Sequence, residues 1–224
     1  MALRRLRRHE RILDMKTRII TIEREYGSGA PKIAERLADQ IGWKLWDQLL
    51  TSEIARLAEC DRTQVEEREE RMDPLYYRLL KSVLRGSFEG SLNVHRLKLL
   101  DADSIFKLTQ RVVHKAATEG NCVLVGRGSA FYLRGREDAF HVFLYAPNED
   151  KLRRLVDGGM NRTEAAELIN TVDQDRSDFI KKYFGQIWPD RHLYHLMINT
   201  HMGDEAVVQT IRNGIAILQN VTGS

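Results

Sequence analysis

Two glycines in a short polar loop, Gly27 and Gly29, are the first residues in this sequence whose spacing suggests chemistry. An apolar run rich in β-branched residues precedes the loop at 19–22, and apolar residues recur with helical spacing after it over 33–41. A strand, a glycine-rich loop and a helix in this order favour anion binding. Glycines let backbone N–H groups turn towards an anion, and the helix N-terminus adds partial positive charge. The stretch 19–41 therefore predicts a phosphate-binding loop.

The loop departs from the common nucleotide-binding motif G-x-x-x-x-G-K-[ST], in which the lysine contacts the β- and γ-phosphates and the hydroxyl contacts Mg²⁺. If Gly29 is the last loop glycine, Arg24 takes the place of the first one. Ala30 then stands at the lysine position and Pro31 at the hydroxyl position, and Lys32 offers an ammonium group two residues late. Proline is normal at the first position of a helix, but it removes one backbone donor and supplies no hydroxyl for a metal.

A second candidate is Arg127, which lies between Gly126 and Gly128 directly after the apolar run 121–125. A short, continuous apolar run is typical of a strand buried on both faces of a parallel sheet. Open α/β sheets bind ligands at the carboxyl ends of such strands. We therefore predict that Arg127 contacts a ligand.

A third candidate is Arg176, which falls on the apolar stripe of a helix expected over 163–184. An inward-facing arginine needs an anion, because an unpaired buried charge is costly. Asp173, about one turn earlier on the same helix, is one partner for it, and a nucleotide phosphate is the other. Basic residues also follow the helix start that we expect at Asn148, and Arg153 and Arg154 are among them.

The composition fits a globular protein, with 42% hydrophobic and 30% charged residues in a chain of 224. No apolar run approaches the roughly 18 residues of a membrane span. The two cysteines, Cys60 and Cys122, form no C-x-x-C pair, and no segment resembles a secretory signal. We expect reduced thiols in a cytoplasmic protein.

Positive charge is concentrated in an N-terminal arm, residues 1–17. Residues 1–18 hold seven basic and two acidic side chains, so their net charge is +5. Because the whole chain has a net charge of +3, the remaining residues have a net charge of −2. A basic arm can bind nucleic acid or an acidic surface, or it can be a disordered tail, and we favour the tail. The body has no basic stripe interleaved with aromatic residues, which argues against nucleic acid as its partner.

The elements that must position these candidates alternate between strands and helices. Strands are expected at 18–23, 43–46, 121–125, 140–146 and 195–200, with helices between and after them. This alternation predicts an α/β fold of three layers, α/β/α, around a mostly parallel sheet of about five strands. Residues 18–224 would form this domain, with the charge-rich segment 61–100 as a helical insertion.

Residues 22–29, R-E-Y-G-S-G at their end, and the helix start at 33–38 resemble the cytidylate kinase-like family, which carries an R-E-x-G-S-G loop. The D-x-x-R pattern of residues 173–176 is similar to a lid element of cytidylate kinases, and it places a lid at 150–184. The resemblance implies a P-loop fold of the nucleoside-monophosphate-kinase type. Two residues depart from cytidylate kinases: Gly128 replaces the acid of G-R-D, and Asn199 replaces the aspartate of the final I-D-T strand.

The resemblance also implies roles for the candidates, with ATP as donor, Mg²⁺ on its phosphates and a nucleoside monophosphate such as CMP as acceptor. Arg127 would bind the acceptor phosphate and Asp47 its nucleoside, although Asp47 is equally suited to cap a helix. Arg176, with Arg153 or Arg154, would neutralise the transferring phosphoryl group. The donor phosphates would be held by the loop residues Arg24, Gly27, Ser28, Gly29, Ala30, Pro31 and Lys32, with Lys32 replacing the missing lysine.

Two functional hypotheses remain open at this point. The first is a nucleoside monophosphate kinase, and the second is a nucleotide- or anion-binding regulatory module with weak or absent transfer. Ala30, Pro31 and Gly128 favour the second, because loss of one preorganised charge at a transition state costs about 10²–10³ in rate. The sequence is compatible with an oligomer and does not identify a metal ligand.

Overall fold

The computed structural model describes residues 17–47, 49–50, 52–54, 56–57 and 102–222. Its centre is one sheet of strand order β2-β3-β1-β4-β5, in which every neighbouring pair is parallel. The predicted α/β fold with a mostly parallel sheet of about five strands is therefore confirmed. The strands are β1 Ile19–Arg24, β2 Lys44–Trp46, β3 Cys122–Val125, β4 Ala139–Tyr145 and β5 Leu196–Asn199.

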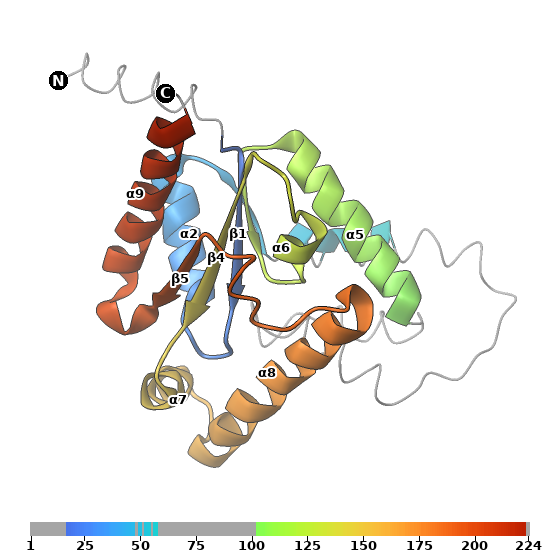
Figure 1. Cartoon of the computed structure of the whole chain (residues 1–224). Helices are drawn as coiled ribbons and strands as arrows, with labels where there is room; N and C mark the ends of the chain where they lie inside the picture. Colours follow the sequence, from blue (N-terminus) through green and yellow to red (C-terminus); the bar gives the residue numbers. More distant parts are fainter. Residues whose placement is uncertain (1–16, 48, 51, 55, 58–101, 223–224) are drawn as a thin grey trace, which may run out of the picture.

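Helices cover both faces of this sheet and give the expected three layers (Figure 1). α2 and α9 pack on one face, where they share a buried apolar cluster with β1, β3 and β4. α5 packs on the other face, and so do α6 and the C-terminal part of α8. The bounds are α2 Ala30–Ile41, α5 Ala102–Glu119, α6 Ser129–Tyr132, α7 Asn148–Asp157, α8 Arg162–Phe184 and α9 Asp204–Thr222, with a 3-10 turn at Thr200–Met202.

The sequence explains the central strands directly. All six residues of β1 and all four of β3 are buried, as expected for strands with helices on both sides. Alternate residues of β1 therefore enter different clusters: Ile20 and Ile22 pack towards α2, whereas Ile19 packs towards α5. This burial holds the carboxyl ends of β1 and β3 in fixed register, with Ile22 opposite Val125.

The chain leaves β1 and β3 towards opposite faces. α2 follows β1 on one face, and α6 follows β3 on the other. A crevice at the carboxyl ends of two neighbouring strands, where the connections diverge, is the usual ligand position in open α/β sheets. In this protein that crevice is bounded by Arg24 on one side and by Gly126 and Arg127 on the other.

Two helix starts differ from the sequence-based prediction. Asn148 was expected to cap α7, but it is the first residue of the helix and Pro147 precedes it as the cap. Proline supplies no side-chain acceptor, and the acidic Glu149 and Asp150 occupy the first turn instead, where they complement the helix dipole. α8 begins at Arg162, because the Asn161 side chain accepts a hydrogen bond from the Thr163 N–H at 2.8 Å.

Several predictions fall on other parts of the chain. The arm at residues 1–16 and the insertion at 61–100 lie outside the described residues, whereas the lid segment 150–184 corresponds to α7 and α8. Both helices extend beyond the carboxyl ends of the strands in Figure 1. Within the described ranges, no helix combines the length and the apolar character that crossing a bilayer requires.

Candidate active site

Three arginines from distant parts of the sequence meet at the carboxyl ends of β1 and β3. Arg24, Arg127 and Arg176 are only 3%, 2% and 5% exposed. They line one small pocket together with Glu23 and Gly128, and its apolar wall is formed by Phe179, Ile180 and Trp188. The structure thus brings together Arg127 and Arg176, which the sequence singled out separately, and adds Arg24 to them.

Local backbone geometry explains how Arg24 and Arg127 reach this pocket. A Cβ at Gly126 would lie 1.5 Å from Nη1 of Arg24, so only glycine leaves room for that guanidinium. Arg127 has φ of +63°, a conformation that non-glycine residues rarely adopt and that costs about 1 kcal/mol or more. Such outliers concentrate at functional sites, which supports a ligand-binding role for this turn.

Arg176 makes both a local and a long-range contact. Its Nη1 donates to the Asp173 carboxylate at 2.9 Å, one turn back on α8, and to the backbone carbonyl of Arg24 at 2.8 Å. The intrahelical partner that the sequence suggested is therefore present. The contact with Arg24 ties α8 to the end of β1, and the phosphate partner stays a prediction.

The three buried arginines repel one another, and a bound anion would relieve this repulsion. Burial and the neighbouring Arg24 lower the pKa of Arg127 to about 9 and that of Arg176 to about 10. Burial raises the pKa of Glu23 and of Asp47, and the positive charge of Arg24 opposes both shifts. Asp47, which the sequence predicted as a substrate-binding residue, is also buried. Its carboxyl group interacts with the charges of Arg24 and Arg127, which oppose the rise in its pKa.

The pKa of Glu23 gives a first testable prediction. Because burial favours its protonated form, ionisation of Glu23 destabilises the fold as the pH rises above its ordinary value of 4.5. We expect Glu23→Gln to raise the free energy of unfolding at pH 8, because the neutral amide avoids the cost of burying the ionised carboxylate. The gain should vanish below pH 4.5, where Glu23 is protonated in both states. Urea unfolding at several pH values measures it, and an equal gain at every pH would contradict the assignment.

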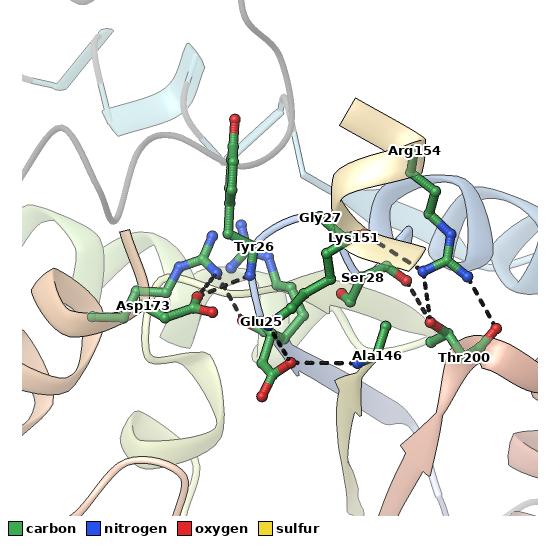
Figure 2. A network of polar contacts seen from close by, with 11 residues as sticks. Glu25, Tyr26, Gly27, Ser28, Ala146, Lys151, Arg154, Asp173 and Thr200 are labelled. Atoms are coloured by element: carbon green, nitrogen blue, oxygen red, sulfur yellow. Dashed lines mark hydrogen bonds and ion pairs between the residues drawn. The ribbon is translucent and has the colours of Figure 1, made fainter. Parts of the chain in front are cut away.

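The loop after β1 is held by side chains from α7 and α8 (Figure 2). The backbone N–H of Tyr26 donates to the Asp173 carboxylate at 2.8 Å. The Glu25 carboxylate accepts from Lys151 Nζ at 3.0 Å and from the Ala146 N–H at 3.3 Å. Side chains of α7 and α8, the segment predicted to form a lid, therefore contact the loop in this structure, and a carboxylate of the protein already accepts from one loop N–H.

Arg154 closes the other side of the loop. Its guanidinium donates to the hydroxyl and the carbonyl of Thr200, both at 3.0 Å, and the Thr200 hydroxyl donates to the Ser28 carbonyl at 2.8 Å (Figure 2). A Cβ at Gly29 would lie 3.5 Å from Arg154 Nε, and one at Gly27 would lie 3.0 Å from the Lys151 Cβ. Gly27 thus allows α7 to approach closely, whereas Gly29 has room for a Cβ and is favoured by its positive φ of +82°.

Two sequence-predicted catalytic residues lie apart from the arginine cluster. The Lys32 side chain is 66% exposed, and its Nζ is 3.5 Å from the Asp204 carboxylate at the start of α9. The Arg153 side chain is 62% exposed and donates to Asp150 at 2.6 Å. Of the two arginines that the sequence offered for the lid, Arg154 is the one at the loop.

The remaining loop residues have different environments. Ala30 is the first residue of α2 and is fully buried in the core cluster between this helix and the sheet. The residue at the lysine position of the common motif therefore packs in the core. Pro31 lies in the first turn of α2, as predicted. The Ser28 hydroxyl is buried and makes no hydrogen bond within the described chain, which makes it a candidate donor to a ligand.

The described residues do not fit a magnesium site built from protein side chains. They contain no group of three or more His, Cys, Asp or Glu side chains suited to hold a metal. Pro31 also stands where the common loop supplies a hydroxyl ligand.

Sequence reasoning placed Arg24 in the donor loop and did not connect it with Arg127. The missing information was strand register: β1 lies directly beside β3, which puts the last residue of β1 next to the Gly126 turn. An arginine at the end of one central strand and a G-R-G turn at the end of another could have predicted that Arg24 and Arg127 lie together. The lining residue Trp188 had no comparable signal.

A parallel sheet of this strand order with a glycine-rich loop after its first strand defines a P-loop kinase-type α/β protein. Comparison with protein families gives the same result, since the model of the cytidylate kinase-like family matches residues 19–202. The chain belongs to the cytidylate kinase-like family. A search of curated proteins finds no match.

Solved structures with the same fold include an uncharacterized protein from Eubacterium ventriosum, with 18% identity and a TM-score of 0.63 over 89% of this chain and 99% of that one. A shikimate kinase from Acinetobacter baumannii in complex with shikimate has 18% identity and a TM-score of 0.47, over 91% and 94% of the two chains. A deoxyadenosine kinase from M. mycoides has 9% identity and a TM-score of 0.43, over 89% and 99%. At 18% identity, the likeness to the Eubacterium ventriosum protein shows the fold alone.

Proposed function

We propose that this protein transfers the γ-phosphoryl group of ATP to a nucleoside monophosphate, most simply CMP. The single observation that carries the proposal is the convergence of three buried arginines at the β1–β3 crevice, in a chain of the cytidylate kinase-like family. Phosphoryl transfer needs little covalent chemistry from the protein, and it depends on positioning and on positive charge around the transferred group.

The positions of the side chains support the following proposed roles. Arg127 would bind the acceptor phosphate, and the buried Asp47 would contact its nucleoside. Arg176 would neutralise charge on the transferred group, with Arg154 supplying the second lid arginine from the other side of the loop. The amides of Gly27 and Gly29 and the Ser28 hydroxyl would hold the donor phosphates, and Mg²⁺ would arrive bound to ATP.

Four further expectations belong to this proposal. Residues 61–100 would cover the acceptor nucleoside, and the segment 150–184 would open to admit substrates and close for transfer. Residues 1–17 would be a basic tail outside the folded domain. The protein would work in the cytoplasm on small nucleotides.

A second candidate function is a nucleotide-binding regulatory module without useful turnover. The observation that favours it is the loop itself: Ala30 is buried in the core, and the Tyr26 N–H already has the Asp173 carboxylate as its acceptor. A loop that lacks the lysine and the hydroxyl loses two groups that stabilise the transferring phosphoryl, each worth about 10²–10³ in rate.

The experiment that separates the two candidates is a coupled assay with ATP, Mg²⁺ and each nucleoside monophosphate in turn, together with calorimetric titration of the same ligands. Turnover with one monophosphate supports the kinase. Binding of ATP or a monophosphate without turnover supports the regulatory module. Absence of both contradicts each proposal and leaves only the fold.

Lys32→Ala provides a second prediction about this site. Because Lys32 is exposed and paired with Asp204 beside α9, we expect its removal to change kcat by less than about threefold, as for most exposed ion pairs. Asp204→Ala is the matched control, because it breaks the same ion pair from the other side. A loss of a hundredfold in Lys32→Ala alone would show that Lys32 leaves Asp204 and replaces the missing loop lysine.

A further inference from the structure

We propose that Arg24 belongs to the acceptor side of the site, where it and Arg127 together hold the phosphate monoester of the substrate. This inference rests on the proposed function but goes beyond it, because it assigns a new residue and a required chemical group. The position of Arg24 in the loop motif would place it on the donor phosphates instead.

The first observation is that Arg24 is buried without its hydrogen-bonding needs being met. Its Nε and Nη2 atoms are buried and have no hydrogen-bond partner within the described chain, although the side chain is only 3% exposed. A buried charged group with unmade hydrogen bonds is costly, so such a group is retained where a ligand supplies the acceptors. Five donors in a planar fork suit a phosphate or carboxylate best.

The second observation is the direction in which Arg24 points. Its Nη1 lies so close to Gly126 that a Cβ there would overlap it, which puts the guanidinium over the turn that carries Arg127. Both side chains line the same pocket, whereas Lys32 and the start of α2 do not line it. The Arg24 guanidinium therefore faces β3, on the side of Asp47, rather than the donor loop.

The third observation concerns charge. Arg24 is a like charge close to both Arg127 and Arg176, and it disfavours the protonated form of each. A phosphate monoester carries about −1.5 to −2 charges near pH 7 and three acceptor oxygens, so it can accept from two guanidinium groups at once. An unphosphorylated nucleoside or an alcohol offers no such charge. The pocket thus selects an acceptor that already carries a phosphate.

The test uses the full chain with Arg24→Met, which keeps the length of the side chain and removes its charge. Arg36→Met is the matched control, because Arg36 is exposed on α2. Calorimetry should show a 10- to 100-fold weaker affinity for CMP in Arg24→Met, as expected for lost hydrogen bonds to a charged group. The affinity for ATP should change by less than threefold, and cytidine should bind both proteins equally weakly.

The thermal midpoint gives an independent readout. Because Arg24 brings a buried charge next to two others, Arg24→Met should melt at the same temperature as the wild type or higher. Arg24→Lys keeps the charge but loses the planar fork, and it should bind CMP more weakly than the wild type. If both variants fail to fold, Arg24 is required by the fold and the proposal is wrong.

The outcomes are distinguishable from those of the proposed function. If Arg24→Met weakens ATP and leaves CMP unchanged, Arg24 is a donor-site residue and the inference is overturned. If the wild type binds no nucleoside monophosphate, the proposed function fails, and titration with inorganic phosphate then decides the inference. Weaker phosphate binding in Arg24→Met than in Arg36→Met supports a phosphate site at Arg24, and equal or absent phosphate binding refutes it.

Discussion

Arg127→Ala should lower kcat/KM for the nucleoside monophosphate by about 10³ and weaken its binding, while the affinity for ATP stays within a fewfold. Removing one preorganised charge from a buried site costs about 10²–10³ in rate, and the loss of a guanidinium–phosphate contact adds to it. Arg127 is almost fully buried and lines the pocket, and Arg24 is proposed to bind the same phosphate with its own guanidinium, so it does not replace the contact that Arg127 loses.

The coupled assay and calorimetry measure this effect, with Arg36→Ala as the control for loss of an arginine elsewhere. Arg127→Lys tests the geometry, because it restores the charge without the fork and should recover only part of the activity. An Arg127→Ala variant that loses ATP binding and keeps CMP binding would contradict the assignment of Arg127 to the acceptor phosphate.

Arg176→Ala should lower kcat by about 10²–10³ and should also destabilise the fold by about 1–3 kcal/mol. The loss in kcat follows from the proposed neutralisation of the transferred phosphoryl group. The loss in stability follows from the structure, because Arg176 joins α8 to the Arg24 carbonyl and is a partner of the half-buried Asp173 carboxylate. Arg162→Ala, an exposed arginine at the start of the same helix, is the control.

A double variant separates the two effects of Arg176. Asp173→Ala combined with Arg176→Ala removes both charges, so no carboxylate is left without its cation, and stability should recover in part. The rate should remain low, because the charge on α8 is still missing. Recovery of kcat in the double variant would mean that Arg176 acts only by holding the fold.

The sequence was sufficient to predict the fold, because the signals for its elements are local. The β-branched run of β1, the apolar run of β3 and the helical spacing in α2 each follow from side-chain chemistry over a few residues. The inward position of Arg176 was also predictable, since helical periodicity alone places it on the buried face of α8. Where a start was wrong, as at Asn148, the choice was between adjacent residues.

The grouping of the site residues was not predictable in the same way. It depends on strand order, which puts β3 directly beside β1 although about a hundred residues separate them, and so places Arg24 over the Gly126 turn. Similarly, helical spacing could not tell whether Lys32 points towards the loop or towards α9, because α9 comes from the far end of the chain. Arg153 and Arg154 are adjacent in sequence, and only packing against Thr200 distinguishes them.

The measurement that tests the central claim most directly is the detection of CDP and ADP by phosphorus NMR after incubation of the protein with ATP, Mg²⁺ and CMP. The wild type should form both products in equal amounts. Arg127→Ala, at the same concentration and with its fold confirmed by thermal melting, should form them about 10³ times more slowly. Absence of CDP with the wild type, or equal rates for the two proteins, would contradict the claim that the arginine cluster binds a nucleoside monophosphate for phosphoryl transfer.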